Sequence, residues 1–320
     1  MKALVFKKVR APIAYEEVPK PESKKGQVLV ALKAAAMNHR EVWMTKGLYP
    51  RLKSEVIMGA DGAGLVDKRA VVINPNVNWG DNPGHFSLAY SILGMPTNGT
   101  FAEYIVVDED KVVDKPEHLT FEQAAALPLA GLTAYRVLMN KCKLKAGEKV
   151  LISGIGGGVA LFAFQFALAA GAEVYVSSSS DEKIQKAIAL GAKGGANYQE
   201  EKWHKNLGRQ VGGFNVIIDS AAGDGLGKLA SLAAMGGRIG IYGGTRGAIN
   251  NLSPQMIFWK QLEIYGSTMG NDEEFSDMVD FVDQHKIVPV VDSVFELSDG
   301  NLAFKRMSEG LQFGKIVLRI

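Results

Sequence analysis

KVLISGIGGGVALFAFQFALAAGAEVYVSSSSDEK, residues 149–183, carries most of the architectural information in this chain of 320 residues. Residues 150–152 predict a buried strand, residues 154–158 a glycine turn, residues 159–170 an apolar helix and residues 174–176 a second strand. In this layout glycines let the backbone approach a pyrophosphate closely, and the helix N-terminus offers free N–H groups and a partial positive charge. The stretch therefore predicts a dinucleotide-binding βαβ unit; a glycine-rich turn without any ligand is the alternative.

Four serines, Ser177 to Ser180, follow the second predicted strand, and Lys183 comes shortly after them. In an enzyme that uses NAD, a carboxylate at this point binds the 2′-hydroxyl of the adenosine ribose. Hydroxyl groups and a lysine suit a 2′-phosphate instead, because they donate hydrogen bonds to it and offset its charge. The run predicts NADPH rather than NADH as the cofactor, and an ordinary solvated serine loop is the alternative.

The composition narrows the class of protein. The chain has 36 Lys and Arg against 34 Asp and Glu, a net charge of +2, which argues against nucleic acid or an anionic membrane as the main partner. The N-terminal residues lack the long apolar region of a signal peptide. Cys142 is the single cysteine, which excludes a disulfide within the chain and any zinc site that needs several cysteines. We expect a reducing, cytoplasmic location and no bound metal.

Two kinds of pattern divide the chain. Residues 1–118 are β-rich and irregular, whereas residues 119–286 alternate helices and strands, which predicts a parallel sheet with helices on both faces. Residues 315–320 predict a terminal strand with no helix after it, and we expect the β-rich N-terminal region to supply the edge with which it pairs. The predicted fold is thus α/β: a doubly wound Rossmann domain, residues 119–286, inserted into a second domain made of residues 1–118 and 287–320.

Several motifs resemble those of the medium-chain dehydrogenase/reductase superfamily, in the zinc-free branch that contains quinone oxidoreductases and related enone reductases. The likeness covers nearly the whole chain. The motifs are MKALV at residues 1–5, MNHREVW at 37–43, GADGAG at 59–64, NGTFAEY at 98–104, AAALPLAGLTAY at 124–135, GGGVA at 156–160, LGA at 190–192 and GKIVL at 314–318. The resemblance implies a GroES-like β-barrel domain beside the Rossmann domain, an active site in the cleft between them, and a homodimer joined through an edge strand of the Rossmann sheet.

The resemblance also implies which residues hold NADP(H). Ser178, Ser179 and Lys183 match the family's 2′-phosphate residues. Tyr198 matches a tyrosine near the same phosphate, and ordinary half-buried packing is an equal alternative for it. Thr133 matches a residue near the nicotinamide, while two later turns match strand ends that face the cofactor. The full predicted cofactor set is Thr133, Gly156, Gly157, Gly158, Val159, Ser178, Ser179, Lys183, Tyr198, Tyr242, Gly243 and Ser267.

The chain departs from the zinc-dependent relatives at the positions of their metal ligands. Those relatives place a cysteine where Asn38 stands, a His-Glu pair where Ala60 and Asp61 stand, and another cysteine near Leu129. None of these thiols exists here, and His39 with Asp61 supplies too few ligands for a catalytic zinc ion. A polar structural role for His39 and Asp61 is therefore the expected one.

Two further segments differ from the family pattern. Residues 76–98 stand where relatives carry a four-cysteine structural zinc lobe, yet this segment has no cysteine. The connection after Val66 is short, whereas relatives usually have a longer hairpin before the strand that matches residues 70–73. We expect no structural zinc and an altered edge of the barrel.

Without zinc there is no Lewis acid to ionise an alcohol or polarise a simple ketone, so the substrate must already be electrophilic. Quinones and α,β-unsaturated carbonyls meet this condition. The residues predicted to act on them are Asn38, as a neutral amide donor to the developing oxyanion, and Tyr49, in a loop that could border the substrate; a surface aromatic is the alternative for Tyr49. Two other readings stay open: a zinc-free alcohol or aldehyde reductase of the same fold, and a non-enzymatic NADPH-binding sensor or structural protein.

Overall fold

The structure is a computed structural model that describes residues 1–320. The chain forms two compact units: a substrate unit, Met1–Leu132 with Gly270–Ile320, and a nucleotide unit, Thr133–Met269. These divisions differ from the predicted ones at residues 118 and 287. Helix α2 (Phe121–Ala126) packs against the β-rich region. Asp272, the first residue of α9 (Asp272–Gln284), forms an ion pair with Lys111 at 2.6 Å. Both helices therefore belong to the substrate unit.

The nucleotide unit contains one sheet of six parallel strands in the order β13-β12-β11-β14-β15-β16. This is the doubly wound Rossmann order, in which the chain reverses direction across the sheet between β11 and β14. The strands are β11 (Lys149–Ile152), β12 (Glu173–Ser178), β13 (Gly194–Asn197), β14 (Phe214–Asp219), β15 (Ala233–Ile241) and β16 (Glu263–Gly266).

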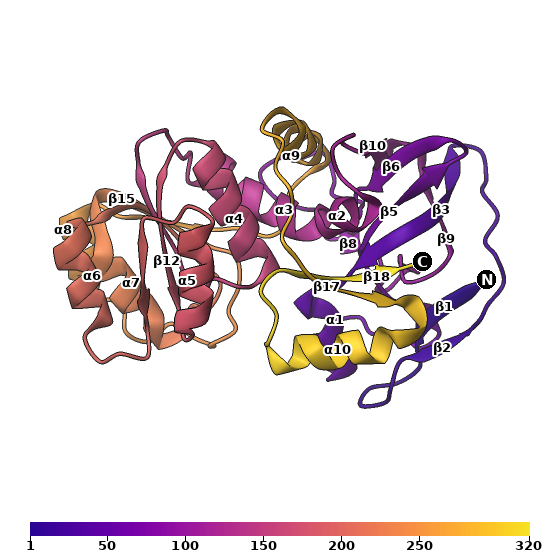
Figure 1. The fold of residues 1–320 in the computed structure, drawn as a ribbon, viewed down its shortest axis with the longest axis horizontal. Coiled ribbons are helices and arrows are strands. Elements are labelled where there is room, and N and C mark those ends of the chain that lie inside the picture. The colour runs from indigo at the N-terminus through magenta and orange to yellow at the C-terminus, as the bar shows by residue number, and fades with distance from the viewer. The chain divides into compact units, whose positions relative to one another are not determined.

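Helices cover both faces of this sheet. Figure 1 shows α4 and α5 on one face and α6, α7 and α8 on the other. Helix α4 is apolar all round and largely buried, as expected for a helix that packs beneath a sheet at the glycine turn. The expected parallel sheet with two covered faces is confirmed. The helices are α4 (Gly158–Ala169), α5 (Asp181–Ala189), α6 (Trp203–Val211), α7 (Leu226–Leu232) and α8 (Pro254–Lys260).

The substrate unit is built on antiparallel β-structure. Its largest sheet has the order β10-β6-β5-β3-β18-β17, with β9 also paired to β3; a three-stranded sheet has the order β2-β1-β4, and β7 pairs with β8. The strands are β1 (Lys2–Phe6), β2 (Ala14–Glu17), β3 (Gln27–Ala36), β4 (Val56–Ile57), β5 (Asp61–Val66), β6 (Arg69–Ile73), β7 (Asn76–Val77), β8 (Ser91–Ile92), β9 (Tyr104–Asp108), β10 (Val112–Asp114), β17 (Val291–Glu296) and β18 (Lys315–Arg319).

The terminal strand β18 joins the N-terminal region, as the sequence predicts. It pairs antiparallel with β3, with Val317 opposite Ala36, and parallel with β17. Both chain ends therefore lie in the substrate unit (Figure 1). The short connection after Val66 is a tight hairpin: Val66 pairs with Arg69, and Asp67 adopts a positive φ of 53° in the turn between them.

The segment of residues 76–98 is held by aromatic packing. The rings of Trp79 and Tyr90 meet edge to face at 5.2 Å, and those of Phe86 and Tyr90 stack at 5.0 Å. The Tyr90 hydroxyl donates to Asn76 Oδ1 at 2.6 Å, which ties the cluster to β7. Three rings thus hold together a segment that has no cysteine.

Three α-helices remain outside the groups described so far. Helix α3 continues directly into a π-helical turn at Arg136–Lys141. No helix combines the length and apolar character needed to cross a membrane. These elements are α1 (His39–Thr45), α3 (Pro128–Tyr135) and α10 (Gly300–Glu309).

Candidate active site and cofactor site

The glycine turn lies between β11 and α4, at the carboxyl end of the central strand. Gly154 and Gly156 have φ values of 66° and 123°, which side-chain-bearing residues rarely adopt. Gly157 caps α4 in an extended conformation, so the first N–H groups of the helix follow directly from the turn. The turn stands where the strand order reverses, which is where doubly wound sheets bind nucleotides. Its backbone therefore fits a pyrophosphate.

Lys183 lies over this turn. A Cβ atom at Gly156 would meet Lys183 Cδ at 2.9 Å and Lys183 Nζ at 3.4 Å, so the ammonium group is close to the glycine backbone. Ser180 caps α5 by accepting a hydrogen bond from the Lys183 N–H at 3.3 Å, which fixes the start of the helix that carries the lysine. The structure thus brings Lys183 and Gly156 together from opposite ends of the 149–183 stretch.

The predicted serines occupy different environments. Ser177 and Ser178 are buried at the end of β12, whereas Ser179 is exposed. Ser178 Oγ accepts from the Ser180 N–H at 3.2 Å, and the Ser178 carbonyl accepts from the Tyr198 N–H at 2.9 Å. No carboxylate stands at the end of β12. The nearest acid along the chain, Asp181, is exposed and accepts from Asn197 Nδ2 at 3.0 Å.

A cavity of about 800 Å³ lies at the carboxyl ends of β11, β12 and β14. Of the predicted cofactor residues, Tyr198 lines it; Ser178, Ser179 and Lys183 do not. The strand ends that line it include Ser153 and Asp219, whose side chains are hydrogen-bonded to each other. The polar residues on the β14 side were not predicted from the sequence; they are Asp219, Ser220, Asp224, Lys228, Thr245 and Arg246. The one sign of these residues in the sequence is the pair Asp219 and Ser220, two polar residues at the end of the apolar strand β14.

The other predicted cofactor residues lie at later strand ends and helix starts. Ser267 Oγ, just after β16, is buried without a hydrogen-bond partner, and its N–H donates to the Ile241 carbonyl at 2.9 Å. The Tyr242 side chain is hydrogen-bonded to Ser220, and burial raises the pKa of the Tyr242 phenol. A Cβ atom at Gly243 would meet the Ser220 carbonyl at 2.7 Å, so only glycine fits there. The unsatisfied Ser267 hydroxyl is an observation that fits a bound cofactor.

Thr133, Gly158 and Val159 complete the predicted cofactor set. Thr133 is buried, and its hydroxyl lies 3.7 Å from Met269 Sδ. Gly158 and Val159 form the half-buried first turn of α4. The glycine turn, Lys183, Tyr198 and the orphaned Ser267 hydroxyl together fit a nicotinamide dinucleotide, which supplies hydride when it is bound.

The substrate unit contains a buried polar network centred on Asn38. Asn38 Nδ2 donates to Asp61 Oδ2 at 2.9 Å, and Lys315 Nζ donates to Asn38 Oδ1 at 2.6 Å and to Asp61 Oδ2 at 2.8 Å. The Leu129 N–H donates to Asp61 Oδ1 at 2.8 Å. Asn38, Asp61 and Lys315 are 7%, 0% and 3% exposed, which shields the ion pair from water. Asn38 was predicted as a site residue, but Lys315 was not, although Lys315 lies within the GKIVL motif.

Next to this network, Arg40 binds the second predicted catalytic residue. Arg40 Nε donates to the Tyr49 hydroxyl at 3.1 Å, and the guanidinium lies 4.8 Å from the Tyr49 ring centroid. Arg40 Nη1 donates to the Leu93 carbonyl at 2.7 Å and to Glu41 Oε1 at 3.3 Å. Glu41 also accepts from the Asn38 N–H at 2.6 Å. Its burial raises the pKa of its carboxyl to about 7, while the Arg40 charge opposes this rise.

The donor set does not fit zinc. No three His, Cys, Asp or Glu side chains anywhere in the chain are grouped so that they could hold a metal ion. Asn38 turns its amide oxygen toward the Lys315 ammonium, which repels a metal cation. The Lys315 ammonium also donates a hydrogen bond to Asp61 Oδ2, so this oxygen already has a cationic partner. His39 packs its ring edge to face on Trp43, with centroids 5.4 Å apart.

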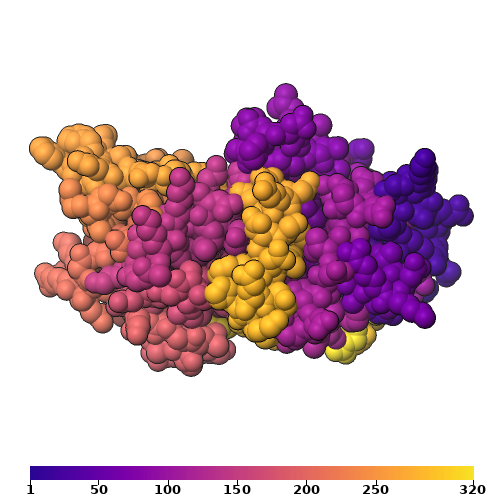
Figure 2. Space-filling model, turned by 90° about the horizontal axis from the view of Figure 1, so that it is seen from above, coloured from indigo at the N-terminus to yellow at the C-terminus, as the bar shows by residue number.

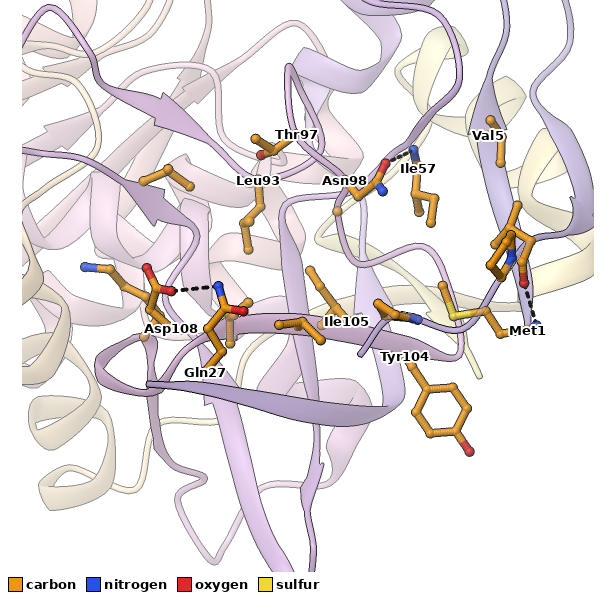
Figure 3. Close-up of a pocket in the computed structure, with 18 of the residues that line it drawn as sticks. Met1, Val5, Gln27, Ile57, Leu93, Thr97, Asn98, Tyr104, Ile105 and Asp108 are labelled. Carbon is orange, nitrogen blue, oxygen red and sulfur yellow. Dashed lines mark hydrogen bonds between the residues drawn. The ribbon is translucent and has the colours of Figure 1, made fainter. Parts of the chain in front are cut away.

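A second cavity, of about 770 Å³, lies within the substrate unit. Figure 3 shows the Gln27–Asp108 hydrogen bond at one end and Met1 with Tyr104 at the other. Neither Asn38 nor Tyr49 lines it. This cavity is therefore separate from the predicted catalytic residues.

Comparisons with known proteins agree with this architecture. Residues 24–117 match the model of the alcohol dehydrogenase GroES-like domain, and residues 158–284 match that of the zinc-binding dehydrogenase family. A zinc-type alcohol dehydrogenase-like protein of Leptosphaeria maculans is 35% identical over 97% of this chain and 95% of its own length. A quinone oxidoreductase of Homo sapiens is 34% identical over 84% of this chain and 78% of its own. A solved structure of an NAD-dependent alcohol dehydrogenase superposes with a TM-score of 0.94 at 35% identity, covering 100% of both chains.

Proposed function

The chain belongs to the medium-chain dehydrogenase/reductase superfamily, and from this premise we propose that it is a zinc-independent, NADPH-dependent oxidoreductase acting on a quinone or an α,β-unsaturated carbonyl. The observation that carries the proposal is the Asn38–Asp61–Lys315 network, which puts an amide and an ammonium group where a metal would need anionic or imidazole ligands. Substrates that accept hydride without Lewis-acid activation fit such a site.

The choice of NADPH rests on the end of β12. The position that binds a ribose hydroxyl in NAD enzymes is Ser178, whose side chain carries no charge. Lys183 places a cation at the adjacent glycine turn. A 2′-phosphate would gain from this cation and would meet no carboxylate, whereas NADH would gain nothing from it.

Asn38 is the proposed donor to the substrate oxygen. One of its two Nδ2 hydrogens is bonded to Asp61, and the other has no acceptor. This N–H could stabilise the negative charge that develops on a carbonyl oxygen as hydride is added. Tyr49 accepts a hydrogen bond from Arg40, so its own O–H remains available to orient or protonate the product.

The decisive experiment follows cofactor oxidation with phenanthrenequinone, an enone and a simple aldehyde, using NADPH and NADH in parallel, with metal analysis of the same sample. We expect rapid NADPH oxidation with the first two acceptors and far less than one zinc ion per chain. Rates highest with the aldehyde would favour an alcohol or aldehyde reductase, the second candidate, which the names of two similar proteins support. Tight NADPH binding without oxidation by any acceptor would indicate a sensor.

The role of Asn38 has its own test. Asn38→Ala should lower kcat by roughly 10- to 100-fold while the Kd for NADPH stays unchanged, because the amide acts on the substrate oxygen. Asn206→Ala, an exposed change on α6, is the matched control and should leave both constants unchanged. An equal loss of kcat and NADPH affinity would contradict the assigned role.

We also propose that the protein is a homodimer joined through β16. This strand is one of the two edge strands of the nucleotide sheet, and Ile264 on it is 37% exposed. On the preceding helix α8, Phe258 and Trp259 are 58% and 72% exposed, and this part of the chain lies at the surface (orange in Figure 2). A second copy of the strand would satisfy the edge and cover the aromatic side chains. Light scattering should give twice the chain mass, and Ile264→Lys should give the monomer; a monomeric wild type would refute the proposal.

A further inference from the structure

Lys315 is the first residue of β18, and its ammonium group is buried. The backbone of this strand is already held, since Val317 and Leu318 pair with Ala36 and Ala35 of β3. The side chain therefore adds little to the pairing of β18. Its two hydrogen bonds end instead on Asn38 Oδ1 and Asp61 Oδ2, two residues far away in the sequence.

We propose that Lys315 is a positioning residue, which acts with Asp61 to fix the orientation of the Asn38 amide for catalysis. The inference rests on the proposed function, because it concerns the donor that is assigned there to the substrate oxygen. The ammonium group can only donate hydrogen bonds, and the ionised carboxylate can only accept them. Asn38 must therefore turn its oxygen toward Lys315 and its Nδ2 toward Asp61.

An inverted amide would be strongly disfavoured. Rotation by half a turn about the terminal bond would face the amide N–H groups toward the ammonium and the amide oxygen toward the carboxylate. Both contacts would then lose their hydrogen bond inside a site that excludes water, where unpaired polar groups are costly. The ion pair thus keeps the second Nδ2–H of Asn38 in one place, with no acceptor of its own in the protein.

Loss of Lys315 would release this constraint. Asn38 could then present its oxygen to the substrate oxygen, which repels rather than stabilises the developing negative charge. The amide would spend only part of its time in the productive orientation, and turnover would fall without loss of the cofactor site. If the ion pair were purely structural, its loss would instead lower stability and leave kcat per folded molecule unchanged.

The test is a double-mutant cycle on the full-length protein with the most active acceptor of the panel. We expect Lys315→Met to lower kcat by roughly 10- to 100-fold, with little change in the KM for NADPH. In the Asn38→Ala background the same change should have no further effect, because the group that it orients is gone. Lys315→Arg, which keeps a donor-only cation, should recover part of the loss.

Lys111→Met is the matched control. It removes a lysine–aspartate ion pair of similar length, 2.6 Å against 2.8 Å for Lys315 and Asp61, in the same unit but outside the Asn38 network. We expect its kcat to match the wild type. If Lys315→Met leaves kcat unchanged, or if its effect adds in full to that of Asn38→Ala, the positioning role is refuted. If Asn38→Ala itself leaves kcat unchanged, the donor role in the proposed function fails instead.

A readout that does not depend on activity is the NMR signal of the Asn38 side-chain amide, assigned by its disappearance in Asn38→Ala. In the wild type we expect two separate, slowly exchanging amide protons. In Lys315→Met they should broaden or exchange faster, and unchanged signals would refute the proposal. Should Lys315→Met fail to fold, Asp61→Asn/Lys315→Met removes both charges together, avoids a buried unpaired charge, and should show the same loss of amide order.

Discussion

The two candidate sites differ in how far apart their residues lie along the chain. In the nucleotide unit, the glycine turn, the serines and Lys183 come from one continuous stretch, residues 149–183. In the substrate unit, Asn38, Asp61 and Lys315 come from three segments, and 277 positions separate Lys315 from Asn38. A local site is fixed once its strand, turn and helix form, whereas the buried network requires the whole unit to be assembled. Substitutions in the first should therefore affect cofactor binding alone, whereas those in the second should affect turnover and stability.

The largest expected effect is that of Asp61→Ala on stability. The change leaves the Lys315 ammonium buried without its ion-pair partner and removes the acceptor of the Leu129 N–H. The free energy of unfolding should therefore fall by about 3–5 kcal/mol. Denaturant unfolding measures this loss. Asp272→Ala, which breaks the partly exposed pair with Lys111, is the control and should cost about 1 kcal/mol or less. Equal losses in the two variants would mean that the buried network is not special.

The next effect is a pH dependence that comes from Glu41. Burial raises the pKa of this carboxyl from 4.5 to about 7, so the folded state favours its protonated form. The stability that this provides is fully present below pH 4.5 and is lost as the pH rises through about 7. The loss amounts to about 3 kcal/mol. The free energy of unfolding of wild type minus that of Glu41→Gln should fall by this amount over that range. Parallel pH curves for the two proteins would contradict the prediction.

Ser178→Asp tests the local site through cofactor choice. A carboxylate at the end of β12 would repel a 2′-phosphate and accept a bond from a ribose hydroxyl. The ratio of kcat/KM for NADPH to that for NADH should fall by about 100-fold. The comparison of the two cofactors in one variant is its own control for folding. An unchanged ratio would mean that the phosphate is recognised elsewhere in the unit, for which Lys228 and Arg246, which line the neighbouring cavity, would be the candidates.

The smallest effect is that of Lys183→Ala, which should raise the Kd for NADPH by about tenfold and leave that for NADH nearly unchanged. The lost interaction is one charge-assisted bond to the 2′-phosphate. Lys186→Ala is the matched control, because Lys186 lies on the same helix, is exposed and pairs with Glu182 at 2.7 Å. Titration of cofactor fluorescence measures the Kd of each variant for NADPH and for NADH. A similar loss in both variants would indicate only a general effect of charge.

The fold was predictable where the pattern is periodic and local. The strands around residues 150 and 175, the apolar helix after the glycine turn and the pairing of the terminal strand with the N-terminal region all agree with the structure. Domain boundaries were less accessible, because α2 and α9 read as part of the helix–strand alternation and yet contact the substrate unit. Propensity and period do not specify which of two cores a helix will join.

The candidate sites show the same limit at the level of single residues. Lys183 was identified because its distance from the second strand is itself the signal. Lys315 was only one letter of a terminal motif, and nothing near it in the sequence points to Asn38. Arg40 and Glu41 stand beside Asn38 in the chain, but as charged residues they would ordinarily be expected on the outside of helix α1, whereas both are buried.

The sequence by itself determined that the chain builds a dinucleotide-binding βαβ unit with hydroxyls and a cation in place of an acid, because glycine conformation, strand period and helix start act over a few neighbouring residues. Only the tertiary structure decided that an ammonium group from the last strand meets an amide at the N-terminal cap of the first helix. Strand register and packing bring those two groups into one dry interior, where each buried polar group must find a partner.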